Sequence, residues 1–318
     1  PAAATSFCAG ADLRAEFAPD EVQALDRAAA AAPYGQGNHW IATRGNRVVH
    51  VIGTMHLDDP RWPGVMEALS PVVAGADRLL VEMTVEEQDA MRDTLARDPA
   101  RAFITEGPTL PEMLSDRDWT RLSAAMADRR VPAVIASRMQ PWLLALMLGL
   151  PTCALRNPAP GEAGLDKRLM EVAAAAGVPV AGLEAFDDLH GLLTAGSPVE
   201  QLDLLMASLP MADRSDDQFA TTAAIYFEEN AGLAWEFARL QAMRGLDLPA
   251  ERIEAVLADF EDRLLVQRNR AWMDTILTAP GDRIAVAVGA LHLMGENGVL
   301  NLLDAAGYRL ERAAFARP

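Results

Sequence analysis

The spacing of apolar and polar residues divides the chain into short strands that alternate with helices. Six apolar runs have the length of a strand and are bounded by glycine, proline or charged residues. They cover residues 39–43, 47–52, 78–83, 178–183, 283–288 and 308–313. The first two flank Arg44-Gly45-Asn46, and this Gly-Asn pair predicts a β-hairpin. A further strand is expected at 131–137.

Helical periodicity fills most of the remaining sequence. Helices are predicted at 20–32, 63–74, 165–176 and 300–306, and residues 85–148 are mostly helical with breaks at prolines. The longest helical stretch, 198–279, carries apolar residues at three- and four-residue steps from Ile253 to Leu265. Such a stripe is typical of a helix packed on a core. Residues 151–164 are rich in Pro, Gly and Ala and predict a loop.

This order of elements predicts an α/β fold with a central mixed, largely parallel sheet. Most strands are separated by a helix that can act as the crossover between parallel strands. Because the stretch at about 198–279 contains no strand, we expect it to form a helical cap or insertion beside the sheet. The whole chain, residues 1–318, is then a single domain.

Two segments far apart in the sequence resemble each other. Residues 49–57 read VHVIGTMHL and residues 285–293 read AVAVGALHL, so each has an apolar strand followed by G-x-x-H and leucine. The separation of His56 and His292 is too large for a short structural repeat. The likeness predicts two pseudo-symmetric halves, each built on a strand that ends in G-x-x-H.

Charge excludes several kinds of partner. Acidic residues number 45 and basic residues 28, which gives a formal charge of −17 and a pI near 4.7. A nucleic-acid partner is not expected, because phosphate binding requires a basic face. An anionic membrane surface is disfavoured for the same reason. We expect no transmembrane segment, since no run of about 18 or more apolar residues occurs.

The two cysteines, Cys8 and Cys153, are too far apart in sequence for a CxxC redox or zinc motif. They are either buried free thiols or a single disulfide that ties the N-terminal arm to the segment after Leu150, and we favour the disulfide. A disulfide would imply an oxidising compartment. The chain starts at Pro1, so either a signal peptide has been removed or the sequence has been trimmed. We therefore expect a periplasmic or secreted protein.

Ionisable side chains lie at the carboxyl ends of four of the predicted strands. These residues are His56, Glu82, Glu184 and His292. Because ligands bind at the carboxyl ends of strands in an open α/β sheet, we expect them to meet at one edge. Two imidazoles and a carboxylate can hold a catalytic metal ion with a water molecule, and a second carboxylate can accept a proton from that water. The alternative is structural, with each His bonded to a loop carbonyl and each Glu capping a helix.

Other features leave alternatives open. Asn269 shares a helix face with Leu265, Trp272 and Ile276, so this polar group needs a partner, either in the site or on another helix. The sequence contains no GxGxxG, no P-loop, no GxSxG and no HExxH motif. Nicotinamide, nucleotide and serine-hydrolase functions therefore lack their usual support.

These motifs resemble the TraB/GumN family, to which the eukaryotic Tiki proteases belong. The two G-x-x-H segments at 53–56 and 289–292 carry most of the likeness, and the block GALHLMGENGVLNLL is the most specific. Further matching segments are Leu80-Val81-Glu82, Gln140-Pro141-Trp142, Gly164-Leu165-Asp166, Gly182-Leu183-Glu184, Arg268-Asn269 and Gly307-Tyr308. The chain departs from the pattern at Leu189, where relatives often carry Gln, and at Trp272, where they often carry Met.

The resemblance implies a fold related to the erythromycin-esterase and ChaN-like proteins, and export from the cell. It also implies a metal-dependent peptidase centred on His56, Glu82 and His292, with Arg268 and Glu184 beside it. The bound ion would be manganese, cobalt or zinc. In this hypothesis Glu184 is the general base and Arg268 stabilises the oxyanion, and the substrate is a peptide or a small molecule.

Three other hypotheses remain open. A metal-free esterase would use one His as its general base, by analogy with the erythromycin esterases. A ChaN-like protein would bind haem or another ligand through a strand-end His. A scaffold could retain the site without catalysis.

Overall fold

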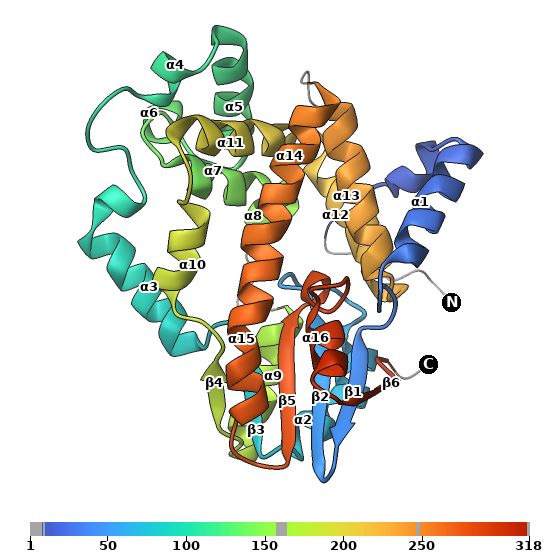
Figure 1. Cartoon of the computed structure of the whole chain (residues 1–318). Coiled ribbons are helices and arrows are strands. Elements are labelled where there is room, and N and C mark those ends of the chain that lie inside the picture. Colours follow the sequence, from blue (N-terminus) through green and yellow to red (C-terminus); the bar gives the residue numbers. More distant parts are fainter. Residues whose placement is uncertain (1–7, 9, 157–163, 246–248, 317–318) are drawn as a thin grey trace.

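A six-stranded sheet occupies one end of the molecule and a layer of helices the other (Figure 1). The computed structural model describes residues 8, 10–156, 164–245 and 249–316. The strand order across the sheet is β4-β3-β5-β2-β1-β6. The strands are β1 (His39–Arg44), β2 (Arg47–Thr54), β3 (Arg78–Val81), β4 (Val180–Gly182), β5 (Arg283–Gly289) and β6 (Arg309–Arg312).

The direction of the strands confirms the predicted mixed, largely parallel sheet. The four neighbours β4, β3, β5 and β2 are parallel, whereas β1 pairs antiparallel with both β2 and β6. The hairpin between β1 and β2 is confirmed as well, because Arg44 pairs with Arg47 across Gly45 and Asn46. Gly45 has φ +61°, a left-handed conformation that glycine adopts without strain.

Helices cover both faces of the central strands, which explains why those strands are almost continuously apolar. Helices α2 (Trp62–Ala74) and α9 (Leu165–Ala176) pack on the face that carries Ile52, Ala285 and Ala287. Helices α15 (Gln267–Thr278) and α16 (Val299–Ala305) pack on the opposite face, against Val51 and Val286. Alternate residues of β2 and β5 thus enter two separate hydrophobic cores.

The second layer consists of helices from two parts of the chain (Figure 1). The N-terminal part contributes η1 (Leu13–Glu16), α1 (Pro19–Ala31), α3 (Val85–Arg97), η2 (Pro99–Arg101), α4 (Leu110–Met113), α5 (Asp116–Asp128), α6 (Ala133–Ala136), α7 (Pro141–Leu148) and α8 (Thr152–Arg156). The later part contributes α10 (Phe186–Leu193), α11 (Pro198–Asp213), α12 (Ser215–Phe227), α13 (Ala231–Gly245) and α14 (Ala250–Glu261). Residues 198–279 are helical throughout most of their described length, as predicted. That these residues form an insertion within a single domain stays a prediction.

One long helical path connects the two layers. Helix α14 passes through a π-helical turn, Asp262–Val266, into α15, so the chain runs from the upper layer down onto the sheet (Figure 1). Such π turns are uncommon and frequently lie near functional sites. In the described residues, no helix combines the length and the apolar character that crossing a membrane requires.

The two strands that precede the G-x-x-H motifs are neighbours in the sheet. Strand β2 pairs in parallel with β5, and Thr54 lies opposite Gly289. Gly53 permits the close approach, because a Cβ there would lie 3.1 Å from the Cα of Ala290. The neighbours of the pair differ, since β1 runs antiparallel to β2 while β3 runs parallel to β5. The likeness of the two halves is therefore limited, in the sheet, to these two strands.

Two local predictions are wrong. Residues 131–137 contain the short helix α6 instead of a strand, since the N–H groups of Ile135 and Ala136 bond to the carbonyl of Pro132. Val134 and Ile135 stay exposed there, because the segment lies among helices without a sheet to join. The loop predicted at 151–164 begins with helix α8, and its residues 157–163 lie outside the described part of the chain.

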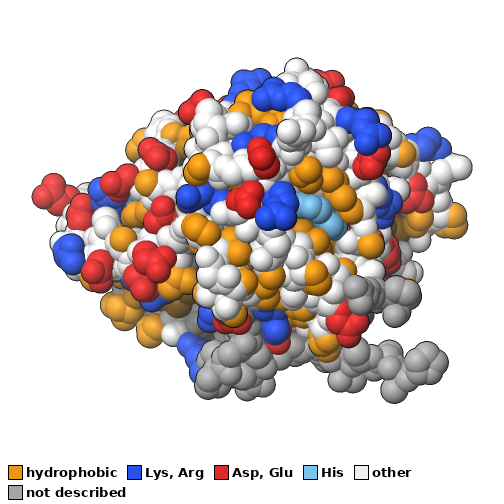
Figure 2. Space-filling model, turned by 90° about the horizontal axis from the view of Figure 1, so that it is seen from below, with side chains coloured by type: hydrophobic (Ala, Val, Ile, Leu, Met, Phe, Trp, Pro, Cys, Tyr) orange, Lys and Arg blue, Asp and Glu red, His pale blue; other side chains and the backbone are white. Residues whose placement is uncertain are grey.

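Charged side chains of both signs are mixed on the end of the molecule formed by the sheet. Figure 2 shows this end with acidic and basic groups next to each other and apolar groups between them. The net charge of −17 is thus not gathered into one acidic patch on this face.

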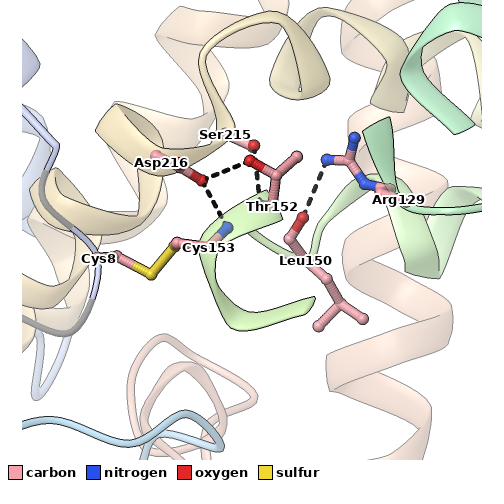
Figure 3. Close-up of a disulfide and its surroundings, with 7 residues drawn as sticks. All are labelled: Cys8, Arg129, Leu150, Thr152, Cys153, Ser215 and Asp216. Atoms are coloured by element: carbon pink, nitrogen blue, oxygen red, sulfur yellow. Dashed lines mark hydrogen bonds between the residues drawn. A yellow bond between two sulfur atoms is a disulfide. The ribbon is translucent and has the colours of Figure 1, made fainter. Parts of the chain in front are cut away.

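A disulfide between Cys8 and Cys153 ties the N-terminal arm to α8, which confirms the predicted pairing (Figure 3). The Cα atoms are 5.4 Å apart. Asp216 of α12 supports α8, since its Oδ1 accepts hydrogen bonds from the backbone N–H of Cys153 and the hydroxyl of Thr152, both at 3.0 Å. The arm itself is held to α12 by the N–H of Leu13, which donates to Oγ1 of Thr221.

Removal of this disulfide is expected to lower stability substantially. The bond joins residues 145 positions apart, so it removes much chain entropy from the unfolded state. We expect the double variant Cys8→Ser/Cys153→Ser to lose about 4 kcal/mol of unfolding free energy. Guanidinium unfolding followed by circular dichroism measures the loss. A reductant should bring the unmodified protein to the variant's midpoint, and an unchanged midpoint would contradict the prediction.

Candidate functional site

Four of the five predicted site residues meet in direct contact at the carboxyl edge of the parallel strands. Glu82 follows β3, Glu184 follows β4, and His292 ends the short helix η4 (Ala290–His292) after β5. Arg268 reaches them from the first turn of α15. Oε1 of Glu82 accepts a hydrogen bond from the N–H of Gly289 at 2.7 Å, which connects the ends of β3 and β5.

Arg268 is the centre of this group. Its guanidinium carries five N–H groups, and each has a partner. Nε–H donates to Glu184, the Nη2 hydrogens to Glu82 at 2.7 Å and Glu184 at 2.5 Å, and the Nη1 hydrogens to the Leu264 carbonyl and Nε2 of His292, both at 3.1 Å. The Leu264 carbonyl belongs to the π turn that precedes α15. The side chain is thus fully satisfied within the protein.

His292 is a buried, neutral imidazole held on both sides. Its Nδ1 lies 2.7 Å from Oδ1 of Asn269, and Nε2 accepts from Arg268, so the proton is on Nδ1. Burial lowers the pKa of His292 to about 4, although the nearby Glu82 acts in the opposite direction. The amide nitrogen of Asn269 donates to the carbonyls of His292 and Asn297, which fixes the orientation of the amide. The ring of Trp272 packs on the imidazole, with centroids 4.5 Å apart.

The two glutamates differ in their protonation behaviour. Burial alone would raise the pKa of Glu82, but contacts with His292, Arg268 and the Gly289 N–H lower it to about 2. Because the pKa of His292 is about 4, the positive charges near Glu82 at neutral pH are those of Arg268 and His56. Burial raises the pKa of Glu184, against the effect of Arg268. Both Glu184 oxygens are nevertheless engaged, because Oε2 also accepts from the indole N–H of Trp272 at 3.2 Å.

His56 has a different environment from the other four residues. It lies on the loop after β2 with 63% of its side chain exposed, and its Nδ1 is 3.3 Å from Oδ1 of Asp166. Asp166 occupies the first turn of α9, where a carboxylate is favoured by the helix dipole. The contact with Asp166 raises the pKa of His56 to about 9, and the charge of Glu82 acts in the same direction. Water screens so exposed a pair, so it favours the protonated imidazole less than a buried pair would.

Local packing brings His56 and Asp166 together. The N–H of Leu165 donates to the carbonyl of Met55 at 2.9 Å, so the start of α9 lies against the loop after β2. Gly164 is required there, because a Cβ would fall 2.2 Å from the backbone carbon of His56. This contact gives a physical reason for the Gly164-Leu165-Asp166 segment.

Two of the three predicted metal ligands lie close together, since Nε2 of His292 is 3.9 Å from Oε1 of Glu82, whereas His56 pairs with Asp166. The lone pair of His292 and Oε2 of Glu82 both face the guanidinium of Arg268, and His56 is turned toward Asp166. Among the described residues, no group of three His, Cys, Asp or Glu side chains is placed to hold an ion. A divalent ion therefore does not fit beside His292 and Glu82 while Arg268 keeps its contacts.

Sequence reasoning left two members of the site without a role. Asp166 appeared only as part of a matched segment, because its partner depends on how α9 packs against the loop after β2. Asn269 was recognised as a polar residue on an apolar helix face, and the structure resolves the alternatives in favour of the site. The remaining histidines lie elsewhere, since His50 pairs with His39 and His190 packs on Trp142.

Comparison with known proteins identifies the family of the chain. The model of the TraB/PrgY/gumN family matches residues 38–312, which include every residue of the site. The chain belongs to the TraB/PrgY/gumN family. It is also 26% identical over 274 residues to the uncharacterized protein YbaP of Escherichia coli K12, with 84% of this chain and 94% of YbaP covered. YbaP of Shigella flexneri matches with the same identity and coverage. The predicted family resemblance is confirmed.

The support that Asn269 gives to His292 can be tested by a pair of asparagine variants. Asn269→Ala leaves buried polar groups of His292 and two carbonyls without their partner, so we expect a loss of about 2 kcal/mol of unfolding free energy. Asn297→Ala is the matched control. It removes only the exposed contact between Oδ1 of Asn297 and Arg270, and should cost less than about 0.5 kcal/mol. Urea unfolding measures both, and equal losses would contradict the structural role of Asn269.

Proposed function

We propose that this protein is a hydrolase and that His56 acts as its general base. The observation that carries the proposal is the pair of His56 and Asp166, in which Nδ1 faces the carboxylate while most of the imidazole is open to solvent. A carboxylate on Nδ1 fixes the tautomer and the orientation of the ring, which leaves Nε2 to accept a proton from water or from a nucleophile. The substrate would be a peptide or a small molecule with a scissile carbonyl.

In this proposal the buried residues around Arg268 form a rigid support for the site. Arg268, Glu82, Glu184 and His292 hold one another by charge-assisted hydrogen bonds, which fix the ends of three strands. A role for Glu184 as a base or for Arg268 as an oxyanion donor would require these contacts to open. We therefore assign Glu184 and Arg268 positioning roles, with His56 as the residue that reaches the substrate.

Export is part of the proposal. The disulfide between Cys8 and Cys153 supports it, because such bonds form and persist mainly in oxidising compartments. A periplasmic or secreted location thus depends on the disulfide.

A metal-dependent peptidase is the second candidate. It is favoured by the adjacency of β2, β5 and β3, which brings His56, Glu82 and His292 to the same sheet edge. An ion held by these side chains would activate a water molecule when bound. The contacts of Arg268 with Glu82 and His292 do not fit such an ion, because they occupy atoms that would hold it.

Metal dependence of turnover separates the two candidates. With fluorogenic peptides and nitrophenyl esters as probes, we expect chelator-treated protein to retain full activity. Activity that requires added manganese, cobalt or zinc would favour the peptidase instead. If the untreated protein hydrolyses no probe with or without these ions, the hydrolase proposal itself is contradicted.

The pH profile tests the role of His56 more directly. A general base must be neutral, and the pKa of His56 is raised, so kcat/KM should increase as pH rises above 6.5 and level off only at alkaline pH. Asp166→Asn removes the carboxylate and should shift this limb to lower pH while lowering kcat by about 100-fold or more. His56→Ala should lower kcat by about 1,000-fold.

The control for these variants is His50→Gln. His50 lies in β2, the strand before the loop that carries His56, and it pairs with His39, so its replacement should leave the profile unchanged. Equal activity of the His56→Ala and His50→Gln proteins would rule out His56 as the base.

A further inference from the structure

The guanidinium of Arg268 supplies a buried positive charge at the centre of the site. The exposed fraction of the Arg268 side chain is 9%, and its Nη2 lies within 2.7 Å of carboxyl oxygens of both Glu82 and Glu184. Nη1 takes the lone pair of His292 at 3.1 Å. Two carboxylates and one imidazole therefore direct their free electron pairs at a single cation. The same three donors would suit a divalent ion such as manganese, cobalt or zinc.

We propose that the guanidinium of Arg268 is the resident cation of this site, and that a divalent metal ion binds Glu82 and His292 only when Arg268 is displaced. The two cations compete first for His292, because Nε2 has a single lone pair and it accepts from Arg268. They also compete for Oε2 of Glu82, which already accepts from Nη2 of Arg268 at 2.7 Å. Oε1 of Glu82 is already held by the N–H of Gly289.

Electrostatics makes the exclusion strong. A divalent ion placed about 4 Å from a guanidinium is repelled substantially even at an intermediate effective dielectric. Removal of the guanidinium has the reverse effect, since it leaves two buried carboxylates that need a positive partner. The inference does not depend on His56 acting as a base, so it can fail or succeed separately from the proposed hydrolase activity.

The test is a cobalt titration of three proteins, followed by visible absorption and by metal analysis after dialysis. The unmodified protein should hold no ion through His292. Arg268→Met should bind close to one equivalent, with an affinity higher by about 100-fold or more. Arg268→Lys is the matched control, because its ammonium group keeps the charge, and it should behave like the unmodified protein.

A second substitution locates the ion. Adding His292→Ala to Arg268→Met should abolish the gain and the absorption of bound cobalt. Circular dichroism and thermal unfolding check that each variant is folded. If Arg268→Met does not fold, Arg268→Met/Glu184→Gln replaces it, since this pair removes the two opposite charges together.

Two results would overturn the inference. The first is one equivalent of metal bound by the unmodified protein and lost in its His292→Ala variant, because ion and guanidinium would then coexist. The second is a folded Arg268→Met protein that gains no affinity for cobalt, manganese or zinc. Either result leaves the pH profile of His56 as an independent test of catalysis.

Discussion

A buried guanidinium must find acceptors for all its hydrogens, and much of this structure follows from meeting that need for Arg268. Charges are rarely buried unless they are paired and hydrogen-bonded. Here the partners come from the ends of β3 and β4, from η4 after β5 and from the π turn before α15. The requirement therefore joins the carboxyl edge of the sheet to the helix that links the two layers. One guanidinium faces two glutamates, and burial raises the pKa of Glu184 even though Arg268 opposes that shift.

The sheet and its two cores hold this group in place. Trp272 of α15 belongs both to a hydrophobic core and to the site. It is fully buried, its indole N–H donates to Glu184, and its ring packs on His292. Helix α9 connects the core on the other face of the sheet to the site. Its buried Leu165 and Leu169 anchor the helix, and its first turn carries Asp166. The two sides of the site thus depend on different hydrophobic cores, and His56 lies where they meet.

Much of the fold was predictable because apolar periodicity reports burial directly. The continuous runs of β3 and β5, the hairpin at Gly45 and the helix ended by Gly177 all follow from local rules. The strand predicted at 131–137 is wrong because β-branched residues indicate a strand only where a sheet is available for pairing. For the site, the sequence identified which residues gather, but not their partners. The separation of an exposed His56 from a buried His292 depends on the packing of α9 and α15, which no local pattern encodes.

The position of β5 also has a consequence for how the chain folds. This strand lies between β3 and β2, yet it is formed by residues 283–289, after almost all other elements have been synthesised. The β1–β2 hairpin and the β3–β4 pair thus have no shared neighbour until the end of the chain arrives. Contacts of such high sequence separation slow folding, since loop entropy is lost before they form. The centre of the sheet is thus completed by a strand that is made near the end of synthesis.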